Sequence, residues 1–168
     1  AASDVYKRQQ ISNLAVEEAG ALFCLMTGYL GKGHVEIEDV HIQDVSATNV
    51  GFPFEILDGS EAGIRNISFR NVDVETRFGV HATTSKANSI SNVSFRDIHI
   101  TAKKSDFVVR DVESNKEKTS VMTFEGIQNL FLDHVCIDVE ESVRDEWMED
   151  VQFFDCTEVE THHCKYKS

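Results

Sequence analysis

The sequence predicts an all-β protein whose chain winds into a right-handed parallel β-helix, a solenoid of about six rungs. Three observations support this prediction. An eleven-residue motif recurs six times, its apolar positions alternate as they do in a strand, and one polar column holds only amides and carboxylates. Random amphipathic sequence would not place Asn or Asp at one fixed position in every repeat.

The repeats start 26, 27, 26, 37 and 21 residues apart. Their first residues are Ile11, Ile37, Ile64, Ile90, Ile127 and Met148. The first, fourth, sixth, ninth and eleventh positions are apolar with few exceptions. The sixth position, which we expect inside the solenoid, holds Val16, Ile42, Phe69, Phe95, Leu132 and Phe153.

The third position of the repeat holds Asn13, Asp39, Asn66, Asn92, Asn129 and Asp150. Asn and Asp tolerate the left-handed backbone conformation and bond locally, so we expect them at bends. Because stacked rungs lie about 4.8 Å apart, these side chains should also hydrogen-bond along the stack. A repeated polar column therefore predicts a ladder.

A further short strand is expected between successive repeats, at residues 52–56, 78–82, 107–109 and 121–124. The hydrophilic residues 114–120 predict a lengthened loop, which accounts for the longest spacing between repeats. Residues 1–9 show no periodicity and resemble adaptor-derived sequence, so we set them aside as a non-native segment. Residues 10–168 are assigned to one β-helix domain, the C-terminal part of a longer protein.

The chain is strongly acidic, with 29 acidic and 16 basic residues and a formal net charge of −13. Such a surface repels phosphate backbones, so we predict no nucleic-acid partner. No apolar run reaches the roughly 18 residues that a membrane span needs, so we predict no membrane partner. The four cysteines form no Cys-x-x-Cys pair, and we predict neither a metal ion nor a cofactor.

The repeat, in the form Ile-x-Asn-Val-x-Phe-x-Asn-Ile-x-Ile, and the following residues 53–56 resemble the polygalacturonase-like glycoside hydrolases of the pectate lyase superfamily. Residues 31–40 and 135–156, with Trp147, are similar to other segments of that family. The resemblance covers residues 10–156. It implies an enzyme that is extracellular or periplasmic, monomeric at full length, and active on a polysaccharide or oligosaccharide substrate.

The resemblance also implies inverting hydrolysis by paired aspartates, one an acid and one a base that activates water. The sequence holds no Asp-Asp, Gly-His-Gly or Arg-x-Lys, and its Asn71-Val72-Asp73 lies inside a repeat. We therefore expect the catalytic residues upstream, leave them unassigned, and expect this chain alone to be inactive. The alternatives are a polysaccharide lyase and a non-catalytic β-helical module that binds glycans, such as an adhesin or tailspike.

Outward columns of neighbouring rungs predict a substrate-binding surface. Arg70 and Arg96 share the seventh position of adjacent repeats, and Asp73 and His99 share the tenth. Two guanidiniums, a carboxylate and an imidazole on neighbouring rungs can bind or hydrolyse a sugar. The same four residues also fit a solvated face with a weak ion pair.

Lys32 and His34 complete the predicted substrate-binding set, because flanking glycines allow a ligand to approach closely. The same glycines also fit a simple turn. Trp147 fits either a sugar-stacking platform or a cap on the last core rung. The tail holds metal-binding residue types in His162, His163 and Cys164, but their spacing matches no zinc signature.

Overall fold

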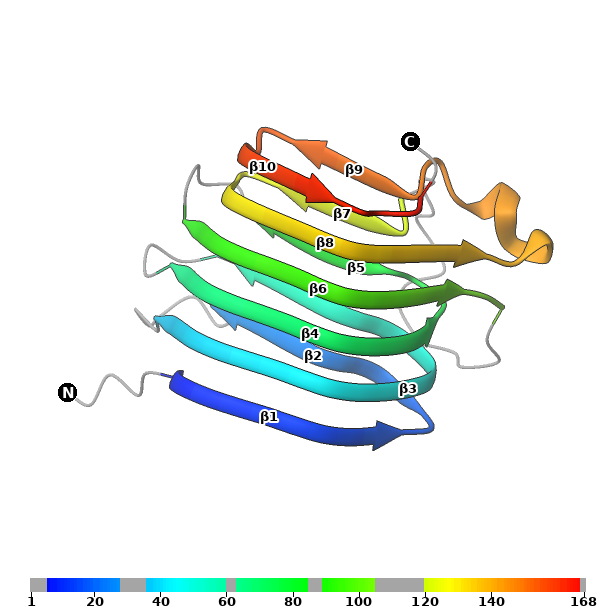
Figure 1. The fold of residues 1–168 in the computed structure, drawn as a ribbon, viewed down its shortest axis with the longest axis horizontal. Coiled ribbons are helices and arrows are strands. Elements are labelled where there is room, and N and C mark those ends of the chain that lie inside the picture. Colours follow the sequence, from blue (N-terminus) through cyan, green and yellow to red (C-terminus); the bar gives the residue numbers. More distant parts are fainter. Residues whose placement is uncertain (1–5, 28–35, 60–62, 85–88, 105–119, 167–168) are drawn as a thin grey trace.

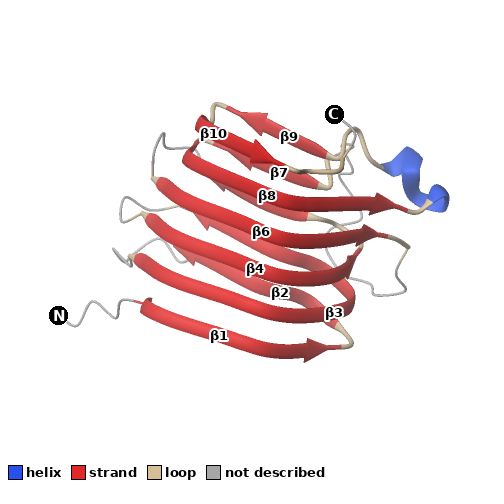
Figure 2. Ribbon diagram, in the orientation of Figure 1, coloured by secondary structure: helices blue, strands red, loops and turns tan. Residues whose placement is uncertain are grey.

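The computed structural model describes residues 6–27, 36–59, 63–84, 89–104 and 120–166. In these residues the chain is nearly all β-strand and forms a parallel β-solenoid (Figure 1), as predicted. The strands are β1 (Tyr6–Val16), β2 (Ala19–Thr27), β3 (Ile37–Asp58), β4 (Ile64–Thr76), β5 (Val80–Thr84), β6 (Ile90–Ala102), β7 (Met122–Glu125), β8 (Ile127–Val139), β9 (Val151–Phe154) and β10 (Thr157–His162). Figure 2 shows the one described helix, the 3-10 turn η1 (Glu141–Glu146), beside the stack.

The strands stack in two faces that the long strand β3 joins. Its first half pairs with β1 and β4, and its second half bends round to pair with β2 and β5. The front sheet therefore holds β1, β3, β4, β6, β8 and β10, and the back sheet holds β2, the second half of β3, β5, β7 and β9. Every pairing between these strands is parallel, and the winding in Figure 1 is right-handed.

Apolar side chains from both sheets fill the inside of the solenoid. In β3, β4, β6 and β8 the first, fourth, sixth, ninth and eleventh positions of the repeat are all buried. The rings of Phe69 and Phe95 stack on adjacent rungs with centroids 4.9 Å apart, and Phe54 and Phe124 reach them from the back sheet. Burying one such ring contributes about 1.5–3 kcal/mol. The predicted phenylalanine core is confirmed.

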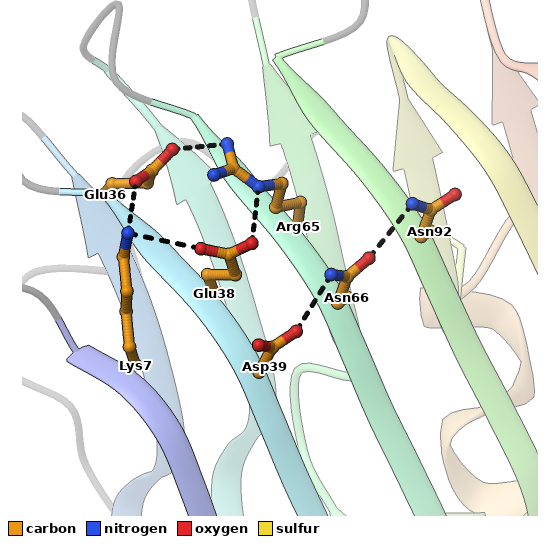
Figure 3. A network of polar contacts seen from close by, with 7 residues as sticks. All are labelled: Lys7, Glu36, Glu38, Asp39, Arg65, Asn66 and Asn92. Atoms are coloured by element: carbon orange, nitrogen blue, oxygen red, sulfur yellow. Dashed lines mark hydrogen bonds and ion pairs between the residues drawn. The ribbon is translucent and has the colours of Figure 1, made fainter.

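The predicted polar ladder is also confirmed. Asn66, Asn92 and Asn129 have φ angles of 58°, 54° and 57°, a left-handed conformation that few other residue types tolerate. The Asn66 amide donates to Asp39 at 2.8 Å, and Asn92 donates to Asn66 at 3.0 Å (Figure 3). Asn129 continues the ladder by donating to Asn92 at 2.8 Å.

An ion-pair network lies beside this ladder on β1, β3 and β4 and on Glu36, which directly precedes β3 (Figure 3). Lys7 Nζ lies 3.0 Å from Glu36 and 3.3 Å from Glu38, and Arg65 pairs with both carboxylates. The hydrogen bond from Arg65 holds the pKa of Glu38 below its usual value. Because these groups are solvent-accessible, each pair contributes little to stability.

The first repeat lies in a different register from the one that the sequence predicts. Tyr6, not Ile11, pairs with Ile37, and Ile11 pairs with Ile42 in the sixth position. The reason is an internal symmetry of the motif. Its apolar residues at positions one, four and six have the same spacing as those at six, nine and eleven, so a slip of five residues keeps the pattern.

The last repeat was also assigned wrongly. Val151–Phe154 forms β9 of the back sheet, where Val151 pairs with Met122 of β7. The sixth front strand is β10, in which Val159 pairs with Leu130 of β8. Sequence periodicity missed β10 because its sixth position, opposite the buried Leu132, holds the polar Thr161. The described front sheet holds six strands, but the solenoid makes about four turns, fewer than the six rungs that the sequence predicts.

The strands expected between repeats have mixed outcomes. Residues 52–56 lie within β3, 78–82 overlap β5, and 121–124 overlap β7. Residues 107–109 and most of the predicted loop 114–120 lie outside the described residues. Strand β1 begins at Tyr6, inside the segment that was set aside, and the non-native origin of that segment stays a prediction. Among the described residues, no helix has the length and apolar character that crossing a membrane requires.

Candidate functional site

The structure places four of the six predicted site residues side by side on the front sheet. Arg70 of β4 pairs in register with Arg96 of β6, and Asp73 pairs with His99. This confirms that each pair shares one outward column on adjacent rungs. Lys32 and His34 lie outside the described residues.

A polar hollow of about 380 Å³ crosses four front strands. It lies along the outward-facing fifth and seventh positions of the repeat. It is lined from β1, β3, β4 and β6 by Gln10, Ile11, Ser12, His41, Ile42, Gln43, Ser68, Phe69, Arg70, Ser94 and Arg96. Within it, His41 Nδ1 and Ser68 Oγ are hydrogen-bonded at 2.6 Å. Hydroxyls, amides, an imidazole and guanidiniums can all bond sugar hydroxyls.

The two arginines of the hollow are held differently. The guanidinium of Arg96 lies over the ring of Phe131, 4.7 Å from its centroid, a contact that orients the charged group. Arg70 has a side chain that is 70% exposed, and its Nε lies 4.0 Å from Asp97 Oδ2. Both guanidiniums can therefore present their planar donors to a carboxylate of a ligand.

Next to the hollow, an imidazole lies between two carboxylates from three successive rungs. His99 Nδ1 lies 3.3 Å from Asp73 Oδ1, and His99 Nε2 lies 2.9 Å from Asp138 Oδ2. Cys136, the register partner of His99 on β8, completes the group. Sequence reasoning found Asp73 and His99 but missed the other two residues. Cys136 shares their tenth column, which is the signal that could have found it.

A second cluster combines one carboxylate with two imidazoles near the C-terminal end of the stack. Asp133 Oδ1 lies 2.9 Å from His134 Nδ1 and 3.2 Å from His163 Nδ1. The hydrogen bond from His163 is the main cause that holds the pKa of Asp133 below its usual value. Both this cluster and the group around His99 bring metal-binding atoms together.

The back sheet carries its own outward column, in which Cys24, Glu55 and His81 occupy neighbouring register positions. Burial, with the nearby Glu55 carboxylate, raises the pKa of Cys24 to about 11, so its thiol is protonated and weakly nucleophilic at neutral pH. Burial lowers the pKa of His81. This column is thus a poor candidate for nucleophilic catalysis.

Trp147 packs against the hydrophobic core, as the capping interpretation predicts. Cys156 packs against the same core, where a free cysteine behaves as a small apolar residue.

No protein-family model matches the chain, and neither a curated protein nor a solved structure does. The fold and its polar face therefore stand as the basis for assigning a class. A parallel β-solenoid with an outward-facing polar sheet fits a carbohydrate-active or tailspike-like module.

Proposed function

We propose that this solenoid binds acidic polysaccharide on its front sheet, as the scaffold part of a glycoside hydrolase of the polygalacturonase type. The observation that carries the proposal is the polar hollow, with Arg70 and Arg96 one rung apart. Stacked rungs repeat about every 4.8 Å, so equivalent donors recur along the stack as sugar units recur along a polymer.

The charge of the hollow supports an acidic sugar as the ligand. The whole chain carries a formal net charge of −13, which repels a polyanion at long range. At physiological ionic strength that repulsion is screened beyond about 8 Å, whereas a guanidinium in contact with a uronate carboxylate is not. None of the described residues lining the hollow is a carboxylate, so nothing in its lining opposes the anionic ligand.

Hydrolysis is not expected at this hollow. A glycoside hydrolase of either stereochemical type needs two carboxyl groups flanking the bond that is cleaved. The absence of carboxylates from the described lining also favours a second candidate, a non-catalytic glycan-binding or tailspike-like module. We expect this chain to bind the polysaccharide without cleaving it, so that no new reducing ends form. In a longer parent chain, reducing-sugar release without an unsaturated product supports the hydrolase, and binding without release supports the non-catalytic module.

Binding is tested by calorimetry with an oligogalacturonate and with the same oligomer fully methyl-esterified. The ester keeps the sugar and removes the charge, so we expect weaker binding of the ester. Arg70→Ala and Arg96→Ala should each weaken binding of the acid by about tenfold, the loss of one charge-assisted hydrogen-bonding group.

Lys104→Ala is the matched control, since it removes an exposed cation beyond the end of β6 and outside the lining of the hollow. It should leave binding unchanged. Equal binding of acid and ester, or an equal loss in Lys104→Ala, would show that the arginines of the hollow do not recognise the ligand.

A further inference from the structure

Three potential metal ligands converge on the front face beside the hollow. His99 of β6 and Cys136 of β8 are register partners, and Asp138 lies two residues further along β8, on the same face of the strand. One donor atom from each, the imidazole nitrogen, the thiol sulfur and a carboxylate oxygen, lies within 4.8 Å of the other two. The three residues therefore present nitrogen, sulfur and oxygen donors to one point.

We propose that His99, Cys136 and Asp138 bind a zinc ion, a role independent of the glycan-binding hollow. Imidazole, thiolate and carboxylate are the side chains that zinc accepts, whereas Mg²⁺ and Ca²⁺ require oxygen ligands throughout. Three protein ligands leave one tetrahedral position for water or a ligand. Asp138 also lines a second hollow, of about 400 Å³, on the side away from β6.

The orientation of His99 supports this assignment. A metal-binding imidazole almost always donates its second ring N–H to a carboxylate or carbonyl, which fixes the tautomer and the ring plane. Asp73 Oδ1 occupies that place, 3.3 Å from His99 Nδ1. The other nitrogen, Nε2, then faces Asp138 Oδ2 at 2.9 Å. Asp73 is thus a positioning residue and not a ligand.

The distance between the His99 and Asp138 ligand atoms needs only a small adjustment to hold the ion. Two atoms bound to zinc at 2.0–2.1 Å with a tetrahedral angle lie about 3.3 Å apart. His99 Nε2 and Asp138 Oδ2 are now 2.9 Å apart, so zinc would replace the proton between them after a shift of a few tenths of an ångström. The side chain of Asp138 is 69% exposed and has room to make that shift.

The cluster of Asp133, His134 and His163 is a weaker candidate. Its two imidazoles stack face to face, with centroids 4.6 Å apart and an interplanar angle of 21°. Lone pairs lie in the ring plane, so those of two nearly parallel rings do not converge on one ion. Both Nδ1 atoms are also held by the same Asp133 oxygen.

The test is titration of the reduced chain with Co²⁺, whose thiolate ligands give a charge-transfer band in the near ultraviolet, followed by displacement with Zn²⁺. The chain should show this band, and Cys136→Ser should abolish it. Cys24→Ser and Cys164→Ser are the matched controls and should keep it. Asp73→Asn should keep the band but weaken Zn²⁺ binding by about tenfold or more, the usual effect of losing a partner of a metal-binding histidine.

Each other result overturns the proposal. A chain without a cobalt–thiolate band has no site of this kind. A band that survives Cys136→Ser but is lost in Cys164→Ser would place the metal at the C-terminal histidines. Circular dichroism checks that each variant folds. Zn²⁺ should raise the Tm of the chain without substitutions but not that of His99→Gln.

Discussion

Strand β6 in the middle of the stack and strand β10 at its C-terminal end occupy equivalent front-sheet positions but differ in packing. β6 lies between β4 and β8, and all five of its inward positions are buried. β10 pairs with β8 alone, and all six of its residues are exposed. Both strands nevertheless keep the left-handed residues of the repeat, Asn92 and Asp97 in one, and Glu158 and, just beyond its end, His163 in the other.

This contrast shows that the backbone bends of a rung and the burial of its side chains have different requirements. Parallel pairing with one neighbour suffices to impose the backbone bends, because the hydrogen bonds transmit the register. Burial needs a rung on each side, since an inward side chain at the end of the stack is covered from one direction only. The same motif position should therefore carry far more stability in β6 than in β10.

The largest expected contrast is between core truncations in the two strands. Phe95 is fully buried and touches the rings of Phe54, Phe69 and Phe124. Phe95→Ala should lower the free energy of unfolding by about 3–5 kcal/mol. Val159→Ala in β10, where the residue is 36% exposed, should cost under about 1 kcal/mol. Urea unfolding measures both, and equal losses would contradict the distinction between central and end rungs.

A smaller loss is expected from breaking the polar ladder in the middle of the stack. Asn92→Ala removes the bonds to Asn66 and from Asn129 and places alanine at a φ of 54°. We expect a loss of about 2 kcal/mol. Asn92→Gly keeps the backbone conformation accessible and so isolates the ladder bonds. If the glycine variant is as stable as the parent chain, the ladder bonds contribute nothing and the backbone carries the whole effect.

The end rung should gain stability from the residue type that central rungs use. Glu158 has a φ of 56° and lies opposite Asn129. Glu158→Asn relieves the left-handed strain and can extend the ladder, so chemical denaturation should show a gain of about 1 kcal/mol. Glu160→Asn removes the same charge from the same strand and serves as the control. A gain common to both variants would indicate relief of charge repulsion instead.

The smallest expected effect concerns pH. Burial lowers the pKa of His81, which lies in β5 between two back strands, below its ordinary 6.5. The unfolded chain then takes up a proton near pH 6.5 before the folded chain does, so stability should fall as pH drops below about 6.5. His81→Gln should reduce this slope in urea unfolding followed at several pH values. An unchanged slope would assign it to other groups.

Much of the central fold was predictable, because each feature is local to the repeat. Alternating apolar residues, as in β4 and β6, indicate which side chains face inward, and a regular Asn column predicts where the backbone bends. The ends were not predictable in register. The spacing of Ile11, Leu14 and Val16 satisfies two alignments five residues apart, and only pairing with β3 chooses between them.

The candidate site, like the fold, was predictable only in part. Columns in the sequence placed Arg70 beside Arg96 and Asp73 beside His99. They did not indicate that Arg96 rests on Phe131 or that His99 lies between Asp73 and Asp138. Those contacts cross two or three rungs, and they depend on side-chain conformation as well as register.

The solenoid, its phenylalanine core and its asparagine ladder can be predicted from the repeat, because each follows from a pattern within one rung. The register of the first rung, the position of the last front strand and the contacts between outward residues become known only when the rungs are stacked. Stacking joins register partners that lie 26 to 42 positions apart in the chain. Which of these residues touch depends on the length of every intervening loop, and no local sequence pattern gives the total length of those loops.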